Sequence, residues 1–248
     1  MNRLPDFFGI TFVINLPERV DRLRWIKKEI ARVGWDMGPD GIQLFPAFRF
    51  VDRANFPSAA IRGCFHSHLE CLEQAHKQGC RSVLILEDDV IFAPSLPRLT
   101  RSILSQLESA DWDLVYFSHE HTGDDSIASL TTSEEDIKLE DWGTRNILTG
   151  YFYGVHGRIL PRLIEHLYRI RNSAEGDPVM GPMTYDGALT TFRTINGDVK
   201  TLIARPKLGR QRPFRSDITP RSFDKVLFLR PLTALLRNLK HLAQSWRS

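Results

Sequence analysis

Three consecutive acidic residues, Glu87, Asp88 and Asp89, follow the apolar segment 83–86 and precede another at 90–92. Adjacent carboxylates repel one another, and a carboxylate at the edge of an apolar core is costly without a positive partner. The first basic residue after them is Arg98, so the partner is either distant in the sequence or a bound cation. Mg²⁺ and Mn²⁺ take oxygen ligands and commonly bind through one or two carboxylates plus substrate phosphates. The three acids therefore predict a metal-bound phosphate site, with a solvated acidic strand end or helix cap as the alternative.

The elements that would position these acids alternate between strands and helices. Short β-branched and apolar runs indicate strands, and apolar residues at helical spacing indicate helices. We expect strands at 10–15, 43–47, 83–86, 113–117, 146–155 and 201–204, and helices after Pro17, at 63–78, 99–107 and 157–171, and after Asp186. This order predicts an α/β fold with a mainly parallel, doubly wound sheet and helices on both faces, in which ligands bind beyond the carboxyl ends of the strands. The polar segment 123–141 is expected to be a long surface loop or lid.

The bulk composition is that of an ordinary globular domain. The chain has 248 residues, of which 42% are hydrophobic and 25% charged, and no run approaches the roughly 20 apolar residues of a transmembrane helix. The N-terminus lacks the order of a signal peptide, so we expect a cytoplasmic protein. The three cysteines, Cys64, Cys71 and Cys80, have no familiar metal spacing and predict small buried thiols rather than a disulfide framework.

Two common phosphate-binding motifs are missing from the sequence. It contains no Gly-x-x-x-x-Gly-Lys-Ser/Thr loop, which disfavours a P-loop nucleoside triphosphatase. It also has no Gly-x-Gly-x-x-Gly after its first strand, which disfavours a dinucleotide-dependent oxidoreductase.

Several segments, in this order, resemble glycosyltransferase family 25, which includes bacterial lipopolysaccharide galactosyltransferases and collagen galactosyltransferases. They are Val-Ile-Asn-Leu at 13–16, Gly-Cys-Phe-His-Ser-His-Leu at 63–69, Leu-Ile-Leu-Glu-Asp-Asp-Val at 84–90, Gly-Tyr-Phe-Tyr-Gly at 150–154, and the segment 206–218.

The resemblance implies a catalytic domain of the GT-A type over residues 1–218. It implies an inverting transfer of a sugar, most often galactose from UDP-galactose, to a saccharide acceptor with the help of Mn²⁺ or Mg²⁺, in lipopolysaccharide or other surface glycan biosynthesis. The acidic motif of the family falls on Glu87, Asp88 and Asp89, with Asp89 and Glu87 as metal ligands and Asp88 facing the nucleotide-sugar.

An inverting transfer needs a general base to take the proton from the acceptor hydroxyl. Asp186 is our candidate for this base, because its place in the order of the motifs fits. A carboxylate at a helix N-terminus is held by backbone amides, although these also lower its pKa. The alternative is that Asp186 is a helix N-cap and nothing more.

The remaining candidates surround the expected nucleotide-sugar. The resemblance brings Gly63, Ser67 and His68 near the nucleotide. Position just beyond the first strand suggests Asn15, Arg19 and Arg22 for the uracil, ribose or phosphate, although the two arginines could equally lie on a solvated helix face. Near the end, Arg212 and Arg215 could clamp the diphosphate, and Gln211 or Asp217 could complete the metal shell.

The C-terminal segment 219–248 has a basic, amphipathic character. From Lys207 onward there are ten basic and two acidic residues, and leucines with Trp246 recur at helical spacing after Pro231. This pattern predicts either a helix resting on an anionic membrane surface, on the cytoplasmic side, or a helix packed on the enzyme's own core. A nucleic-acid partner is not expected, because the basic residues carry no recognised motif.

Two rival functions remain open at this point. A metal-dependent nucleotidyltransferase could use a similar sheet and similar acids, but it usually carries a Gly-rich N-terminal loop that this chain lacks. A catalytically silent saccharide-binding or scaffold protein could keep the fold without the metal.

Overall fold

The computed structural model describes residues 3–39, 41–119, 127–129, 131–147, 150–174, 177, 180 and 184–212. A seven-stranded sheet, with strands in the order β2-β1-β3-β7-β5-β8-β6, forms its centre. Its strands are β1 (Ile10–Asn15), β2 (Ile42–Pro46), β3 (Ser82–Glu87), β5 (Leu114–Ser118), β6 (Lys138–Asp141), β7 (Phe152–His156) and β8 (Thr201–Arg205).

Five of the seven strands run in the same direction. Strand β1 is parallel to both of its neighbours, β2 and β3, and β5 is parallel to β8. Strand β7 is antiparallel to β3 and β5, and β6 is antiparallel to β8. The expected mainly parallel α/β sheet is therefore confirmed, with two strands inserted in the opposite direction.

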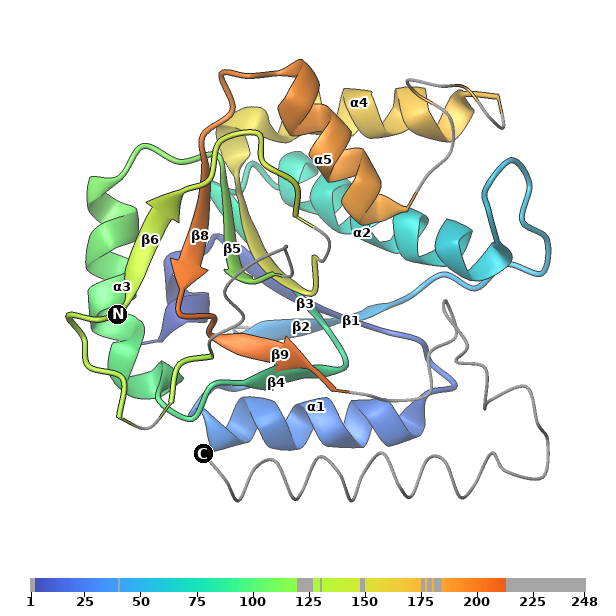
Figure 1. Ribbon diagram of the computed structural model, residues 1–248. Helices are drawn as coiled ribbons and strands as arrows, with labels where there is room; N and C mark the ends of the chain where they lie inside the picture. The colour runs from blue at the N-terminus through green and yellow to red at the C-terminus, as the bar shows by residue number, and fades with distance from the viewer. Residues whose placement is uncertain are drawn as a thin grey trace.

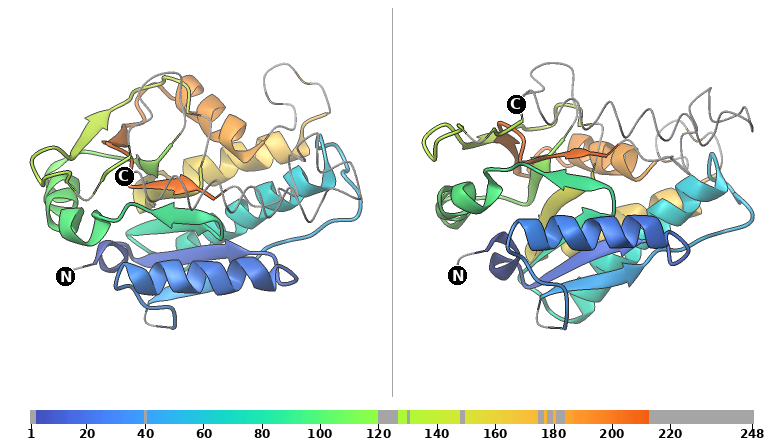
Figure 2. Two further views of the ribbon diagram at one scale, coloured as in Figure 1. Left: turned by 60° about the horizontal axis from the view of Figure 1, so that its bottom comes forward. Right: turned by 90° about the horizontal axis from the view of Figure 1, so that it is seen from below.

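Helices cover both faces of this sheet (Figures 1 and 2). One face packs against α2 (Ala59–Lys77), α4 (Leu160–Asn172) and α5 (Tyr185–Ile195), whose apolar residues share a core with β1 and β3. The other face packs against α1 (Val20–Arg32) and α3 (Leu96–Ser109). Because both faces are covered, the central strands are buried along their whole length, which explains their continuous apolar sequences.

The helix ends follow from local sequence. Helix α2 begins at Ala59, four residues before the expected start, because the Ser58 side chain accepts a hydrogen bond from the Ile61 amide and caps it. Helix α1 ends just before Gly34, which has a φ of +74° that glycine adopts at little cost. Two short 3-10 helices, η1 (Leu4–Phe7) and η2 (Gly157–Ile159), complete the described helices.

A second, two-stranded sheet was not expected from the sequence. Strand β4 (Val90–Phe92) follows the acidic motif and pairs antiparallel with β9 (Gly209–Gln211), which places Val90 opposite Gln211. The expected loop at 123–141 is partly outside the described residues, and its last four residues form strand β6 at the edge of the main sheet.

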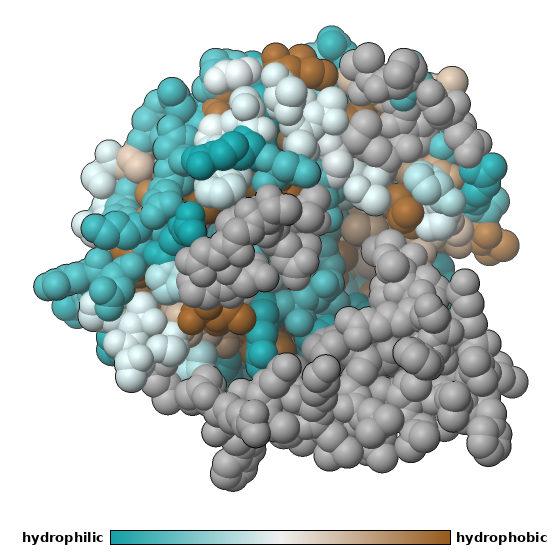
Figure 3. Space-filling view, in the orientation of Figure 1, coloured by the Kyte–Doolittle hydropathy of each residue, from teal (hydrophilic) through white to brown (hydrophobic). Residues whose placement is uncertain are grey.

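On the face shown in Figure 3, hydrophilic residues cover most of the described surface and apolar residues lie in small, separate patches. Among the described residues, no helix combines the length and the apolar character needed to cross a membrane. The C-terminal helix expected at 219–248 lies outside the described residues.

Candidate active site

The three acids lie at one end of the sheet, beside a cavity. Glu87 is the last residue of β3, and Asp88 and Asp89 form the turn that leads into β4. The cavity has a volume of about 310 Å³. It is lined by Ile14, Leu16, Arg22, Ala47, Phe48, Arg49, Phe50, Ala59, Ala60, Cys64, Ser67, His68, Glu87, Asp88, Asp89 and Gln211. It thus opens beyond the carboxyl ends of β1, β2 and β3, where ligands of open α/β sheets bind.

Both carboxylate oxygens of Asp88 accept hydrogen bonds from residues of the first strand and the first helix. The Asn15 amide donates to Asp88 Oδ2 at 2.7 Å, and Arg22 Nη1 donates to Asp88 Oδ1 at 2.9 Å. Burial raises the pKa of Asp88 above its ordinary value, and the Arg22 charge opposes that rise. Asn15 and Arg22, predicted to contact the nucleotide-sugar, both contact Asp88 of the acidic motif in this structure. Arg22 is also the positive partner, distant in sequence, that the acids required.

Asp89 is engaged on one oxygen only. Its Oδ2 accepts hydrogen bonds from Gln211 Nε2 at 3.1 Å and from Arg22 Nη1 at 3.3 Å. Its Oδ1 is buried and has no hydrogen-bond partner among the described residues. Burial, followed by the charge of Glu87, raises the pKa of Asp89 to about 8. A buried carboxylate in this state is stabilised by an additional positive charge.

A hard divalent cation fits this set of oxygens. Asp89 offers the buried Oδ1, Glu87 offers a half-buried carboxylate, and Gln211 offers its amide oxygen. Carboxylate and amide oxygens are the ligands that Mg²⁺ and Mn²⁺ prefer. The pairing of β9 with β4 brings Gln211 to Asp89, so the structure places three of the four residues predicted as metal ligands together. The fourth, Asp217, lies outside the described residues.

The three residues predicted on helix α2 have different surroundings. Ser67 is completely buried; its hydroxyl donates to the Gly63 carbonyl at 2.7 Å and accepts from the Phe48 amide at 2.9 Å. Gly63 allows this close packing, because a Cβ there would lie 2.4 Å from the Phe48 carbonyl oxygen. His68 lies deeper, with Nε2 at 3.4 Å from Glu87 Oε1 and Nδ1 at 2.9 Å from the Tyr153 hydroxyl. In this structure Ser67 and Gly63 hold the segment after β2 against α2, and His68 contacts the acidic motif.

Asp186 is not the helix N-cap, and that part of the expectation was wrong. Thr184 is the N-cap of α5, with its side chain accepting a hydrogen bond from the Gly187 amide, and Asp186 is the second helical residue. Both residue types cap helices well, so sequence alone did not separate them. The Asp186 carboxylate lies against Gly150, where a Cβ would come within 2.9 Å of Oδ1. Its charge contributes, after burial and Glu87, to raising the pKa of Cys64, so Asp186 lies near the cavity although it is not among the described lining residues.

Two of the predicted arginines have partners away from the cavity. Arg19 makes a two-point contact with Asp21, with both nitrogen–oxygen distances at 3.0 Å. The Arg212 guanidinium lies 3.7 Å from the centre of the Trp25 ring, and its backbone amide donates to the Asp89 carbonyl at 2.7 Å. Neither arginine is among the described lining residues. Arg215 lies outside the described part of the chain.

Sequence reasoning missed three residues that line the cavity. Phe48 and Phe50 follow β2, and their rings stack with centres 6.2 Å apart and an interplanar angle of 23°. Phe48 remains 41% exposed, whereas the Arg62 guanidinium lies 3.9 Å from the centre of the Phe50 ring, so Phe48 is the more accessible of the two rings. Cys64, predicted as an inert buried thiol, also lines the cavity. The only signal for it was its spacing of four residues from His68, which places the two side chains on one face of a helix.

Several known proteins are similar in sequence to part of this chain. Residues 54–141 match the model of "Glycosyltransferase family 25 (LPS biosynthesis protein)". A glycosyltransferase 25 family member from Anopheles gambiae is 27% identical over 166 residues, which cover 60% of this chain and 26% of that protein. Another from Aedes aegypti is 33% identical over 182 residues, which cover 62% of this chain and 27% of that protein. Procollagen galactosyltransferase 1-A from Xenopus laevis is 22% identical over 175 residues, with 62% and 28% covered.

The chain thus spans about a quarter of the length of the curated relatives that it matches. Among solved structures, the crystal structure of A197 from STIV aligns with a TM-score of 0.39 and 12% identity, over 84% of this chain and 85% of that chain. The matched segment 54–141 contains the part of α2 that lines the cavity and the whole acidic motif. The match over 54–141 and these relatives show that this part of the chain is similar to glycosyltransferase family 25.

Proposed function

We propose that the protein is a divalent-metal-dependent glycosyltransferase that binds a UDP-sugar in the cavity at the ends of β1, β2 and β3. The observation that carries this proposal is the state of Asp89, which is buried, has one oxygen without a partner among the described residues, and lies beside Glu87 and Gln211. The family supports transfer of a sugar, and the name of the Xenopus laevis relative suggests galactose. The acceptor is a saccharide, with lipopolysaccharide or another surface glycan suggested by the family description.

The metal in this proposal is Mn²⁺ or Mg²⁺, held by Glu87, Asp89 and Gln211. When bound, it supplies positive charge that offsets the diphosphate of the donor and the charge that develops on the leaving nucleoside diphosphate. Neighbouring residues already hold the carboxylates of Asp88 and Asp89 in fixed positions by hydrogen bonds. Arg22 occupies Oδ2 of Asp89 and directs the free Oδ1 to one side, and together with Asn15 it fixes Asp88.

The nucleotide base is assigned to the aromatic surface of Phe48 and Phe50. Both rings line the cavity directly after β2, two strands away from the acidic motif, and Phe48 is partly exposed. Bases stack on aromatic side chains with a free energy of about 1–3 kcal/mol. A donor bound in this way extends from the aromatic surface across the ends of β2 and β1 to the acids after β3.

Proton transfer from the acceptor is assigned to Asp186. Its carboxylate lies near the cavity from the α5 side, against Gly150, whereas the metal ligands come from β3, the turn after it, and β9. An acid that approaches from a different element can contact the acceptor hydroxyl while the donor is held from the opposite side, as an inverting displacement requires.

The test measures release of nucleoside diphosphate from a panel of sugar nucleotides by the full-length protein, with Mn²⁺ or with a chelator. We expect slow hydrolysis of one donor, most readily UDP-galactose, which chelation and Asp89→Ala both abolish. Asp198→Ala is the matched control, because Asp198 is an exposed acid that pairs with Arg162 on the surface, and it should hydrolyse the donor like the intact protein. Release of pyrophosphate from a nucleoside triphosphate and a sugar phosphate would instead identify a nucleotidyltransferase. Absence of both hydrolysis and metal-dependent donor binding would identify a silent saccharide-binding protein.

A further inference from the structure

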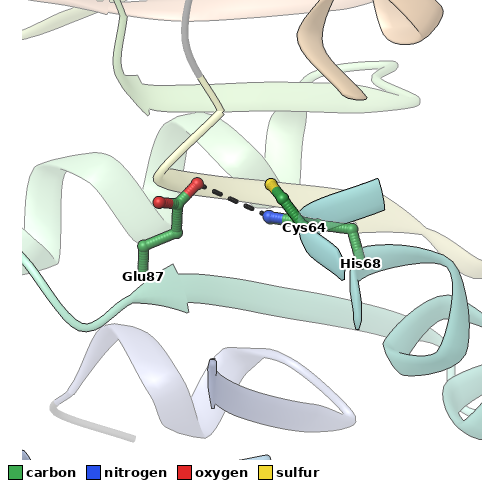
Figure 4. A group of neighbouring side chains, drawn as sticks. All are labelled: Cys64, His68 and Glu87. Carbon is green, nitrogen blue, oxygen red and sulfur yellow. Dashed lines mark ion pairs between the residues drawn. The ribbon is translucent and has the colours of Figure 1, made fainter. Parts of the chain in front are cut away.

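A second group of metal-ligating side chains lies in the same cavity, and the proposed function does not use it as a group. Cys64 and His68 lie four residues apart on α2 and so share one face of the helix. Together with Glu87 at the end of β3 they line the cavity, and one ligand atom from each lies within 4.8 Å of the others. Figure 4 shows the sulfur of Cys64 and the ring nitrogen of His68 side by side, both turned toward the Glu87 carboxylate.

The hydrogen bonds around His68 determine which of its nitrogens can accept a cation. The Tyr153 hydroxyl donates its hydrogen to the Tyr185 hydroxyl at 2.8 Å, so toward His68 it acts as an acceptor. His68 Nδ1, at 2.9 Å from Tyr153, must therefore carry the ring hydrogen. The neutral ring then presents the lone pair of Nε2 to Glu87 Oε1, 3.4 Å away. Two acceptors at this distance need a positive charge, which is either a proton on Nε2 or a cation between them.

The spacing fits a zinc ion better than it fits Mg²⁺. Ligands at about 2.0–2.3 Å from a tetrahedral Zn²⁺ lie about 3.3–3.8 Å from one another. The separation of Nε2 and Oε1 is already in this range, and the sulfur, which lies within 4.8 Å of both atoms, needs an approach of at most about 1 Å. One sulfur, one nitrogen and one oxygen form the mixed set that Zn²⁺ accepts, whereas Mg²⁺ and Ca²⁺ select oxygen alone. Three protein ligands also leave a fourth position open to the cavity, as in zinc sites that bind a small molecule.

We propose that Cys64, His68 and Glu87 form a zinc-binding site in the cavity, which shares Glu87 with the oxygen site but adds a sulfur and a nitrogen ligand from α2. Zn²⁺ binds to the Cys64 sulfur, His68 Nε2 and a Glu87 oxygen, and the Cys64 thiol releases its proton to solvent as the zinc–sulfur bond forms. Tyr153 is a positioning residue, because its hydroxyl fixes the His68 tautomer that turns Nε2 to the metal.

A consequence follows for the reaction, and this step alone rests on the proposed function. Glu87 belongs to both ligand sets, so a Zn²⁺ ion that holds it withdraws one ligand from the Mn²⁺ site. Zn²⁺ is therefore expected to antagonise the Mn²⁺-dependent reaction rather than replace Mn²⁺ in it.

The test uses the full-length, metal-free, reduced protein, with Co²⁺ as a spectroscopic substitute for Zn²⁺. A cobalt–thiolate bond gives a charge-transfer band in the near ultraviolet, which neither a cobalt–carboxylate nor a cobalt–imidazole bond produces. We expect this band in the intact protein and its displacement by Zn²⁺. Competition with a coloured chelator then measures the Zn²⁺ affinity.

Matched variants assign the site. Cys64→Ser should lose the thiolate band and bind Zn²⁺ about 100-fold or more weakly. Cys80→Ser, which removes a partly exposed thiol that is not among the cavity's described lining residues, should keep both. Tyr153→Phe should keep the band and weaken Zn²⁺ binding about 10- to 100-fold, with circular dichroism confirming that the variant is folded. A spectrum without a thiolate band, or a band that persists in Cys64→Ser, overturns the proposal.

One more variant separates this proposal from the proposed function. Asp89→Asn removes a ligand of the oxygen site but none of the zinc site. We expect it to keep the cobalt–thiolate band while losing donor hydrolysis with Mn²⁺. Loss of the band in Asp89→Asn would show that a single mixed site exists, and so would contradict the distinction between the two ligand sets.

Discussion

Replacing Asp89 by asparagine should make the metal-free protein more stable at pH 8 and remove its response to Mn²⁺. In the intact protein, burial and the neighbouring Glu87 raise the pKa of Asp89 to about 8, whereas an unfolded aspartic acid titrates near 3.8. The folded protein therefore holds a proton that the unfolded chain has lost between these two pH values. Stability from this residue is fully present below pH 3.8 and is lost as the pH rises through 8.

The size of the effect follows from the two pKa values. The difference is about four pH units, and each unit corresponds to about 1.4 kcal/mol, so the upper limit is on the order of 5 kcal/mol. Asparagine keeps the size of the side chain without the charge, but Arg22 then loses one of the two carboxylate partners that it has among the described residues. We therefore expect Asp89→Asn to raise the free energy of unfolding by about 2–4 kcal/mol at pH 8, and by close to zero at pH 4.

Thermal unfolding in the presence of a chelator, from pH 4 to pH 8, measures this difference. A gain of about 1 kcal/mol raises the melting temperature of a domain of this size by about 2–4 °C. Addition of Mn²⁺ at pH 8 should stabilise the intact protein, because ligand binding to the folded state raises its stability, and should leave the variant unchanged. Asp198→Asn is the control, since Arg162 lowers the pKa of Asp198 and its stabilisation is instead lost as the pH falls. The reasoning is refuted if Asp89→Asn is no more stable than the intact protein at pH 8, or if Mn²⁺ stabilises both equally.

Three further substitutions test other parts of the site. Asp186→Asn should lower the rate of transfer to a saccharide acceptor about 10²- to 10⁴-fold, while the affinity for the donor stays unchanged. Steady-state kinetics with a fixed acceptor measure both quantities. An equal loss of donor binding would contradict a role of Asp186 as the base. Phe48→Ala should weaken UDP binding about tenfold through lost base stacking, as measured by calorimetry in the presence of Mn²⁺; unchanged affinity would place the base elsewhere. Gly63→Ala should reduce the free energy of unfolding by about 1–3 kcal/mol, because the added Cβ would lie 2.4 Å from the Phe48 carbonyl oxygen. Urea unfolding measures this change. An unchanged free energy of unfolding would show that the segment after β2 moves aside easily.

The parts of the site that the sequence predicted depend on strand ends. Asn15 and Glu87 end neighbouring parallel strands, and the register pairs Ile14 with Glu87, so polar residues at these ends must meet. Arg22, in the first turn of the following helix, also lies at this edge, although it was predicted to contact the nucleotide-sugar and not the acids. These contacts follow from the alternation of strands and helices and from the rule that parallel strands share a carboxyl edge.

Gln211 was a candidate metal ligand from the sequence, but the pairing of short segments that brings it to Asp89 was not predicted. Gln211 reaches Asp89 across 122 residues because two three-residue strands, β4 and β9, pair with each other. Strands of this length carry no periodic pattern that distinguishes them from loops. Cys64 was missed for a different reason, since a small thiol fits an amphipathic helix equally well as core or as ligand.

The pairing of β4 with β9 also determines when the site is complete during synthesis. The Arg212 amide donates to the Asp89 carbonyl at 2.7 Å, and the Leu208 amide donates to the Phe117 carbonyl at 2.8 Å. Residues 208–212 therefore pair with segments that precede them by about 90 to 120 residues in the sequence. The acids of the motif leave the ribosome more than a hundred residues before Gln211 does. Until then Asp89 lacks the Gln211 side chain, and a ribosome-bound chain that ends before β9 has the acids but not the full ligand set. The proposed oxygen site would therefore be completed only late in the synthesis of each new chain.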